Sequence, residues 1–154
     1  MSERILVGNR SCFGVEIEVT SLLGGVWADV LLWIAGESLG RKEDAFALYP
    51  LLGTMNGLLR RASDDASTAE IMSLPAGAAW SRFEALGGEY SVHTCYLFDR
   101  YEVYCVSDYR EARFLWKSRY LEVPVRHDAR VPRSELARVA EELRAVHERL
   151  SRES

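Results

Sequence analysis

The chain has 154 residues, 48% of them hydrophobic and 27% charged, with a formal net charge of −4 and a pI of about 5.5. These values are typical of a globular protein, and we expect a single domain over residues 1–154. They argue against a nucleic-acid-binding protein, which needs a basic face for phosphate contacts. A mildly acidic surface favours a basic protein partner instead.

No segment predicts export or membrane insertion. The longest strongly apolar stretch, residues 26–35, is half the length of a membrane span. The N-terminus lacks an apolar run followed by a small-residue cleavage site, so no signal peptide is expected. The odd number of cysteines (Cys12, Cys95 and Cys105) favours reduced thiols over a disulfide framework. We therefore expect a cytoplasmic protein.

The first half of the chain predicts a β-hairpin and then helices. Residues 13–20 alternate apolar and polar side chains, which is typical of a half-buried strand. The glycines of "SLLGG" supply a turn before a second, more apolar strand at 26–36, and an edge strand is expected near 38–40. A helix is expected from about Pro50, because proline suits a first helical turn, and a short one within 75–88.

The second half predicts a meander and a long helix. Residues 63–68 are polar and predict a loop. Four runs rich in aromatic and β-branched residues then predict antiparallel strands: "EYSVHTCYLF", "YEVYCVS", "ARFLWKS" and "YLEVPVR". Residues 130–150 predict the clearest helix, with an apolar stripe from Leu136 to Leu150 at three- and four-residue steps. The stripe is expected to pack on the sheet; gripping a partner helix is the alternative.

These elements together predict an α+β fold. We expect a mostly antiparallel sheet of five to seven strands, made of the N-terminal hairpin and the C-terminal meander. Helices, including the long C-terminal one, are expected on one face of this sheet. The order of the strands does not follow from the sequence.

Glu16 and Glu18 point to the same side of the first strand, about 7 Å apart. That spacing falls in the range of roughly 6.5–9.5 Å between the carboxylates of inverting glycosidases. Catalysis is nevertheless disfavoured, because parallel side chains on one strand do not flank a substrate. A metal site shared with Asp29 is disfavoured as well, since hard cations need six or more oxygens from a wrapping loop. The favoured interpretation is the solvated face of a half-buried strand.

His93, Cys95 and Cys105 offer a different chemistry, a zinc site, with His127 as a conceivable fourth ligand. The tight Cys-x₂₋₄-Cys spacing of structural zinc and the zinc-deaminase signatures are missing, so buried thiols beside a histidine are favoured. No G-x-S-x-G elbow, P-loop or G-x-G-x-x-G turn occurs. We expect no catalytic residue and no cofactor. A small-ligand- or zinc-binding protein or enzyme that uses the aromatic meander is the alternative function.

The second predicted strand is apolar on both faces. Val30 and Leu32 share one face, and Leu31 and Trp33 share the other with Asp29. Either the fold covers both faces, or one face exposes a patch that binds a partner, as aromatic hot spots do. A homodimer seam is a further possibility for such a face.

Four segments together resemble immunity protein family 42 of bacterial polymorphic toxin systems, over roughly residues 6 to 145. They are "GNRSCFGVEIEV", "VLLWIAGESLG", "FDRYEVYCVSDYREARFLWK" and "LEVPVRHDARVPRSELARVAEEL". The resemblance rests on hydrophobic pattern and order, not on a catalytic signature. It implies a small α+β protein without catalytic residues that binds a cognate toxin domain in the cytosol.

With this resemblance, the leading hypothesis is a protein inhibitor that covers a toxin's active site or blocks its working conformation. We expect a protein partner, no nucleic acid and no membrane, and a monomer or homodimer. The acidic hairpin and the segment after it form the expected toxin-binding surface, with Trp33 as an anchor. Its residues are Glu16, Glu18, Asp29, Trp33, Glu37, Glu43 and Asp44.

Overall fold

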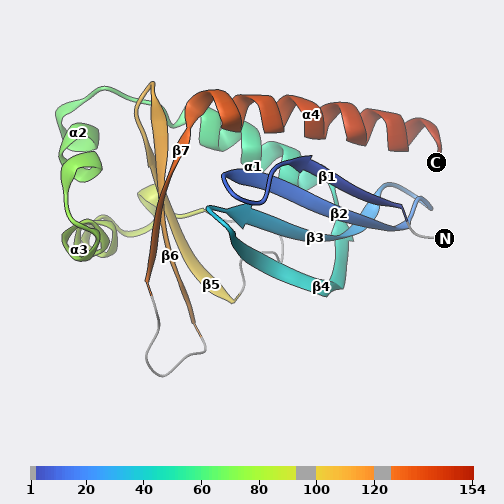
Figure 1. The fold of residues 1–154 in the computed structure, drawn as a ribbon, viewed down its shortest axis with the longest axis horizontal. Helices are drawn as coiled ribbons and strands as arrows, with labels where there is room; N and C mark the ends of the chain where they lie inside the picture. The colour runs from blue at the N-terminus through green and yellow to red at the C-terminus, as the bar shows by residue number, and fades with distance from the viewer. Residues whose placement is uncertain (1–2, 93–99, 120–125) are drawn as a thin grey trace.

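The computed structural model describes residues 3–92, 100–119 and 126–154, with the backbone alone at 41–44 and 87. It confirms the predicted α+β class, and the strands in these ranges pair antiparallel (Figure 1). The strands divide over two sheets, which the sequence did not indicate. Sheet A has the order β1-β2-β3-β4, and sheet B has the order β5-β6-β7.

Sheet A contains the predicted hairpin between two further strands. Strands β2 and β3 are the two expected strands, and β4 is the expected edge strand, although it is much longer than predicted. Strand β1, on the opposite edge, was not predicted. The bounds are β1 Arg4–Gly8, β2 Phe13–Ser21, β3 Trp27–Ile34 and β4 Glu37–Ala47.

Sheet B confirms only the middle of the predicted meander. Strands β5 and β6 correspond to the runs "YEVYCVS" and "ARFLWKS". The first predicted strand is wrong at its start, where a 3₁₀ helix, η1 (Gly87–Tyr90), stands. Ser91 of that run forms an antiparallel bridge with Tyr104 of β5, as a strand there would. Residues 93–98 of the run and most of the fourth run lie outside the described residues. The third strand of sheet B, β7, begins directly after the fourth run rather than within it. The bounds are β5 Tyr101–Ser107, β6 Glu111–Ser118 and β7 His127–Pro132.

Three of the four α-helices were predicted. Proline at the start of α1 sits in the first turn, as expected. The loop predicted over 63–68 is confirmed at 63–65 and wrong at 66–68, where α2 begins. The Asp65 carboxylate accepts a 2.7 Å hydrogen bond from the Thr68 amide and caps this helix. Within the described ranges, no helix has the length and apolar character needed to cross a membrane. The bounds are α1 Tyr49–Arg60, α2 Ala66–Ser73, α3 Ala76–Leu86 and α4 Arg133–Arg152.

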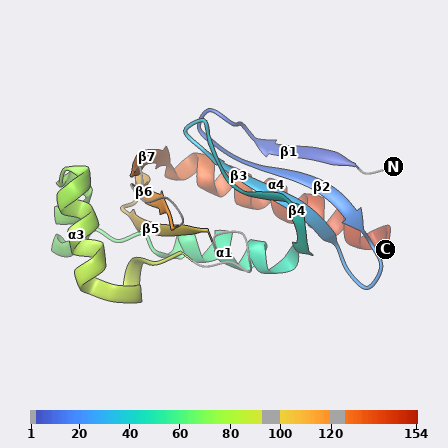
Figure 2. The same cartoon turned by 90° about the horizontal axis from the view of Figure 1, so that it is seen from below.

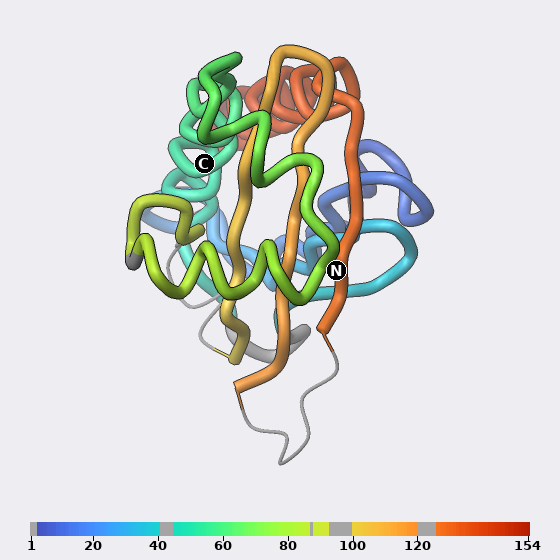
Figure 3. The backbone as a smooth tube through the Cα atoms, turned by 90° about the vertical axis from the view of Figure 1, so that its left-hand side faces the viewer, coloured from blue at the N-terminus to red at the C-terminus, as the bar shows by residue number. Residues whose placement is uncertain are grey.

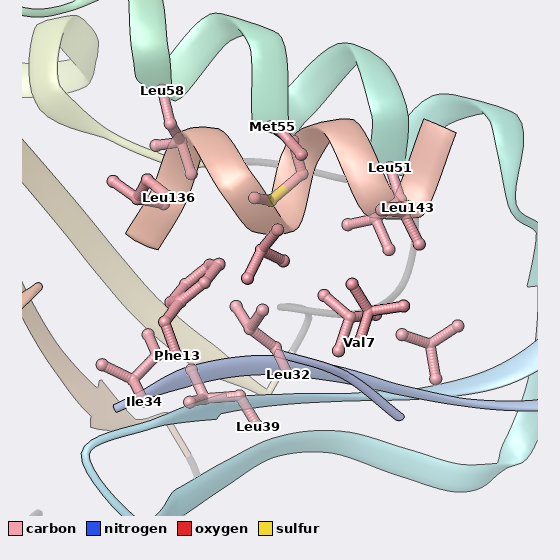
Figure 4. Close-up of a cluster of buried hydrophobic side chains, with 14 of the residues drawn as sticks. Val7, Phe13, Leu32, Ile34, Leu39, Leu51, Met55, Leu58, Leu136 and Leu143 are labelled. Atoms are coloured by element: carbon pink, nitrogen blue, oxygen red, sulfur yellow. The ribbon is translucent and has the colours of Figure 1, made fainter. Parts of the chain in front are cut away.

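The main core lies between sheet A and the helices α1 and α4 (Figure 4). Leu32 of β3 points from the sheet toward Met55 of α1 and Leu143 of α4, and all three side chains are buried. The apolar stripe of α4 therefore packs within the fold, as the favoured interpretation held. Phe13 of β2 stacks on Phe114 of β6 with ring centroids 6.0 Å apart, which joins the core of sheet A to sheet B.

Helices α2 and α3 form a second layer on the far side of sheet B (Figure 3). Phe83 of α3 stacks on Tyr104 of β5 at 5.1 Å between centroids, and Trp80 meets the same ring edge-on. Sheet B is thus covered on both faces. Among the described residues, helices cover one face of sheet A, and no described helix lies over the other face (Figure 2).

Arg113 of β6 links α2 to sheet B through an ion pair and hydrogen bonds. Its side chain is 2% exposed and makes a two-pronged ion pair with Asp128 of β7, at 3.0 and 2.8 Å. The third guanidinium nitrogen donates to the carbonyls of Ile71 and Leu74 at the end of α2, at 2.8 and 2.6 Å. One cation therefore satisfies a carboxylate and two carbonyls at the end of a helix.

Arg113→Lys should lower the free energy of unfolding by about 3 kcal/mol, because lysine cannot reproduce the fork and leaves buried acceptors without donors. Urea unfolding followed by circular dichroism measures the loss. The matched control is Arg138→Lys, at an exposed helical pair with Glu135 and Glu142, where about 0.5 kcal/mol or less is expected. Equal losses at the two positions would contradict the fastening role of Arg113.

Candidate functional site

The face of sheet A turned away from α1 and α4, here called the outer face, gathers four of the seven predicted toxin-binding residues. Val15 and Ile17 of β2 are fully buried on the inner side. Glu16 and Glu18, which alternate with them along the strand, therefore point outward. The same alternation in β3 turns Asp29 and Trp33 outward. The prediction that these four side chains share a face follows from the strand period of two.

Glu18 lies directly opposite Asp29 across the β2–β3 pair and opposite Arg4 across the β1–β2 pair. The Arg4 guanidinium lies 3.4 Å from the Glu18 carboxylate. We call these three residues the anionic row, because two carboxylates stand beside one guanidinium. Like charges opposite each other destabilise a sheet, and Arg4 offsets this repulsion.

The next row along the strands is apolar at both ends. Glu16 pairs with Leu6 of β1 on one side and Leu31 of β3 on the other, and we call these three the leucine row. Leu6 is 45% exposed, whereas only 15% of the Glu16 side chain is exposed. Arg10 binds the Glu16 carboxylate through its Nε, at 3.0 Å, and through Nη2. The Glu16 carboxylate is therefore ion-paired with Arg10.

Trp33 occupies the third row, where Gly14 is its partner on β2. The Arg10 guanidinium lies over the Trp33 ring, 5.3 Å from its centroid, in a cation–π contact. Arg10 thus joins Trp33 to Glu16. Trp33 is half-buried rather than projecting.

The loop between β1 and β2 holds Arg10 in this place. The Asn9 side chain accepts a 2.7 Å hydrogen bond from the Cys12 amide, and the Asn9 carbonyl folds over Gly14. A Cβ at Gly14 would lie 2.7 Å from that carbonyl oxygen, so the close approach requires glycine. The loop also binds the β3–β4 turn, since the Gly36 amide donates to the Arg10 carbonyl at 2.8 Å.

The other three predicted residues lie apart from this cluster. Glu37 is exposed at the first position of β4, opposite Ile34. Glu43 and Asp44 lie in β4 where the register shifts, since Val30 pairs with residue 41 and Ala28 with residue 46. The register places their backbone beside Asp29. Their side chains are not among those described.

Three residues of the outer face escaped the sequence analysis: Arg4, Leu6 and Arg10. All three depend on β1 or on the loop after it, and β1 was not predicted. The alternation of "RILVG" was the available signal, with Ile5 and Val7 facing the core. A strand prediction over these five residues would have put Arg4 and Leu6 on one face, although their pairing with β2 would not have followed from it.

The described side chains leave only a small hollow at the carboxylates of the outer face. The hollow among Arg4, Glu16, Glu18, Asp29 and Leu31 has a volume of about 10 Å³, which is the size of one water molecule at most. Ligand pockets are typically about 300–1,000 Å³. This surface suits contact with another protein surface far better than it suits a small substrate.

The proposed zinc ligands are only partly described. Cys105 is fully buried in the main core, 3.8 Å from the Ser107 hydroxyl. His127 stacks on Trp116 at 5.0 Å between centroids. His93 and Cys95 lie outside the described residues, so the zinc hypothesis stays a prediction. In the described ranges, no three His, Cys, Asp or Glu side chains gather where they could hold a metal ion.

The described aromatics of the meander fill space between layers. Phe114 and Trp116 of β6 are buried in the main core. Tyr104 of β5 is enclosed by Trp80 and Phe83 of α3, and burial raises the pKa of its hydroxyl. Phe114, Trp116 and Tyr104 thus line packed interfaces, whereas Tyr90 lines a hollow of about 210 Å³ beside Val106 and Ser107. The ligand pocket of the alternative hypothesis stays a prediction.

Burial raises the pKa of the Cys105 thiol to about 12, with only partial compensation from Ser107 and Arg61. At pH 8 the thiol is therefore protonated, and the thiolate is the reactive form. In a Cys12→Ala/Cys95→Ala variant, we expect no reaction with a chromogenic disulfide reagent until urea is added. The control, Cys95→Ala/Cys105→Ala, keeps the partly exposed Cys12 and should react in the native state. Rapid native labelling of Cys105 would contradict its burial.

Comparison with known proteins supplies the family. The family model for immunity protein 42 matches residues 1–146, and the chain belongs to that family. The family prediction from the sequence is thereby confirmed. No match is found among curated proteins or among solved structures.

Proposed function

We propose that this chain is a cytosolic immunity protein that binds a cognate toxin domain and neutralises it by occupying its surface. Membership of the immunity protein 42 family supports a toxin as the partner. The outer face of sheet A carries the proposal structurally, because a rigid four-stranded sheet presents carboxylates, leucines and a tryptophan there without a described helix over them. Such a mixed surface is typical of protein interfaces.

The proposed contact surface is the acidic hairpin with the segment that follows it. It comprises Glu16, Glu18, Asp29 and Trp33 on the outer face, together with Glu37, Glu43 and Asp44 along β4. Carboxylates on a rigid strand attract a basic partner and orient it before contact. A toxin domain that acts on an anionic substrate has a basic active-site surface, which this face would cover.

The mechanism needs no catalytic residue, metal or cofactor in this chain. Inhibition follows from occupancy, so one molecule of this chain silences one toxin domain. The cytosol is the compartment in which a toxin reaches the producing cell's own targets, and free thiols at Cys12 and Cys105 agree with a reducing compartment. A monomer and a homodimer both suit the proposal.

Co-expression of the neighbouring toxin domain with this chain should restore growth, and the two proteins should co-elute from a size-exclusion column. Protection in vitro should saturate at one chain per toxin domain. A toxin with its active site inactivated should still bind, because binding does not depend on turnover. Protection by far less than one equivalent would indicate an enzyme, and a folded chain that neither binds nor protects would remove the proposed function.

A further inference from the structure

We propose that this chain forms a homodimer in which strand β1 pairs antiparallel with β1 of a second copy, about a two-fold axis at Leu6. Two features of β1 support this pairing: its place at the edge of sheet A, and the symmetric spacing of its outward backbone groups about Leu6. The dimer goes beyond the proposed function, because its formation needs no toxin. It would extend sheet A of one copy into sheet A of the other and present two outer faces on the same side.

Strand β1 lies at the edge of sheet A. Strand β2 pairs with one side of it, and no described strand pairs with its other side (Figure 2). Edge strands are commonly protected against further pairing by a lysine, a proline or a bulge. The register between β1 and β2 runs without a shift, and the central residue of β1 is Leu6, which is 45% exposed. The middle of this edge strand therefore carries none of these protections.

The hydrogen bonds that flank β1 show which of its backbone groups point outward. The Glu3 carbonyl accepts a hydrogen bond from the Val19 amide at 2.9 Å, and the Asn9 amide donates to the Phe13 carbonyl at 3.0 Å. Hydrogen-bonded residues alternate along an antiparallel pair, so every second residue from Glu3 to Asn9 bonds to β2. The residues between them direct their N–H and C=O groups away from β2.

The outward-directed residues are Arg4, Leu6 and Gly8, and they are spaced symmetrically about Leu6. When β1 pairs antiparallel with a second β1, Leu6 faces Leu6 of the second copy, and Arg4 faces Gly8. Each facing pair then exchanges two hydrogen bonds. Any shift of this register leaves at least one outward-directed residue without a partner on the other β1. The edge is therefore self-complementary, as a two-fold interface requires.

The side chains on the outer face suit the same register. The two Leu6 side chains stand directly opposite each other, with their Cβ atoms about 5 Å apart, so each removes apolar surface of the other from water. Arg4 faces a glycine, which has no side chain, and it keeps its 3.4 Å ion pair with Glu18 of its own copy. The leucine rows of the two copies join across the seam into one continuous row.

Helix α4 is placed so that two copies can lie side by side. It contacts both β1 and β2 on the inner face, so the α4 helices of the two copies would be about two strand spacings, or about 10 Å, apart. Arg149 marks the side of α4 toward this edge, because it binds Glu3 at 2.7 Å. Ala145 and Glu142 lie on that side one and two turns earlier. A small residue between opposite charges suits a contact between two such helices.

Sedimentation equilibrium over a series of protein concentrations tests for the dimer. We expect a reversible change from the chain mass of 17.4 kDa to twice that mass, since a short seam gives an association that depends on concentration. A single species of 17.4 kDa at every concentration would overturn the proposal.

Leu6→Pro tests the backbone pairing, because proline lacks the outward N–H and is tolerated on an edge strand. Both copies lose that hydrogen bond, so the dissociation constant of the dimer should rise about tenfold or more while the circular dichroism spectrum stays unchanged.

The matched control is Ser38→Pro on β4, the opposite edge of sheet A. Ser38 is exposed, and its N–H also points away from the sheet, because the bond from the Ala35 amide to the Cys12 carbonyl fixes the alternation in β3. This variant should dimerise as the wild-type chain does.

A cross-link tests the register. In a Cys12→Ala/Cys95→Ala background, Cys105 is buried. Leu6→Cys in that background should give a covalent dimer with a short bis-maleimide, because the two residues face each other. The control is Leu23→Cys, at an 88% exposed position between β2 and β3, which should stay monomeric. If Leu6→Pro does not fold, the cross-link decides alone.

Two further results would overturn the dimer through β1. A dimer that persists in folded Leu6→Pro, or that cross-links through position 23 as readily as through position 6, has its seam elsewhere. A chain that is monomeric alone, loses toxin binding in Leu6→Pro and keeps it in Ser38→Pro uses this edge for a strand of the toxin. The proposed function is tested separately, by binding and protection with the wild-type chain.

Discussion

One-sided burial of sheet A is the constraint on which the rest of the structure depends. Its inner face is apolar along β1, β2 and β3, and α1 and α4 bury it in the main core. Because the side chains of a strand alternate, that same burial turns Glu16, Glu18, Asp29 and Trp33 outward together. A slip of one residue in the pairing would send the carboxylates into the core. The stability of the core and the composition of the outer face are therefore set by the same register.

Arginine serves two purposes in this chain. Arg113 and Arg130 reach from sheet B to the carbonyls at the end of α2, so they hold the second layer in place. Arg4 and Arg10 bind carboxylates of the outer face and shape its charge. The net charge of −4 does not show this division, because these arginines form ion pairs and hydrogen bonds with neighbouring residues. The distribution of charge over the outer face therefore depends on these individual pairs and does not follow from the net charge.

The elements with strong hydrophobic periodicity were predicted correctly from the sequence. The alternation of β2 and the stripe of α4 led to the correct strand and helix, because each has a buried face that repeats over many residues. The short elements failed. Strand β1 has five residues, and β7 has six, of which only Ala129 and Val131 are apolar side chains that mark a buried face. Helix α2 was not predicted, because its start is polar. Asp65, its N-cap residue, was the signal that the prediction missed.

Only the part of the candidate site that lies on correctly predicted strands could be predicted from the sequence. The alternation of β2 and β3 placed Glu16, Glu18, Asp29 and Trp33 on one face. The pairing of β1, and the loop that brings Arg10 over Trp33, depend on contacts between distant residues, so Leu6 and Arg10 could not be assigned to the site. The packing of the two sheets against each other likewise brings distant residues together, as where Phe13 stacks on Phe114.

A crystal structure of this chain with its toxin domain tests the central claim most directly. We predict that the toxin lies on the outer face of sheet A and covers Glu18, Asp29 and Trp33. A toxin seated on α2 and α3, with the outer face of sheet A left in solvent, would contradict the account.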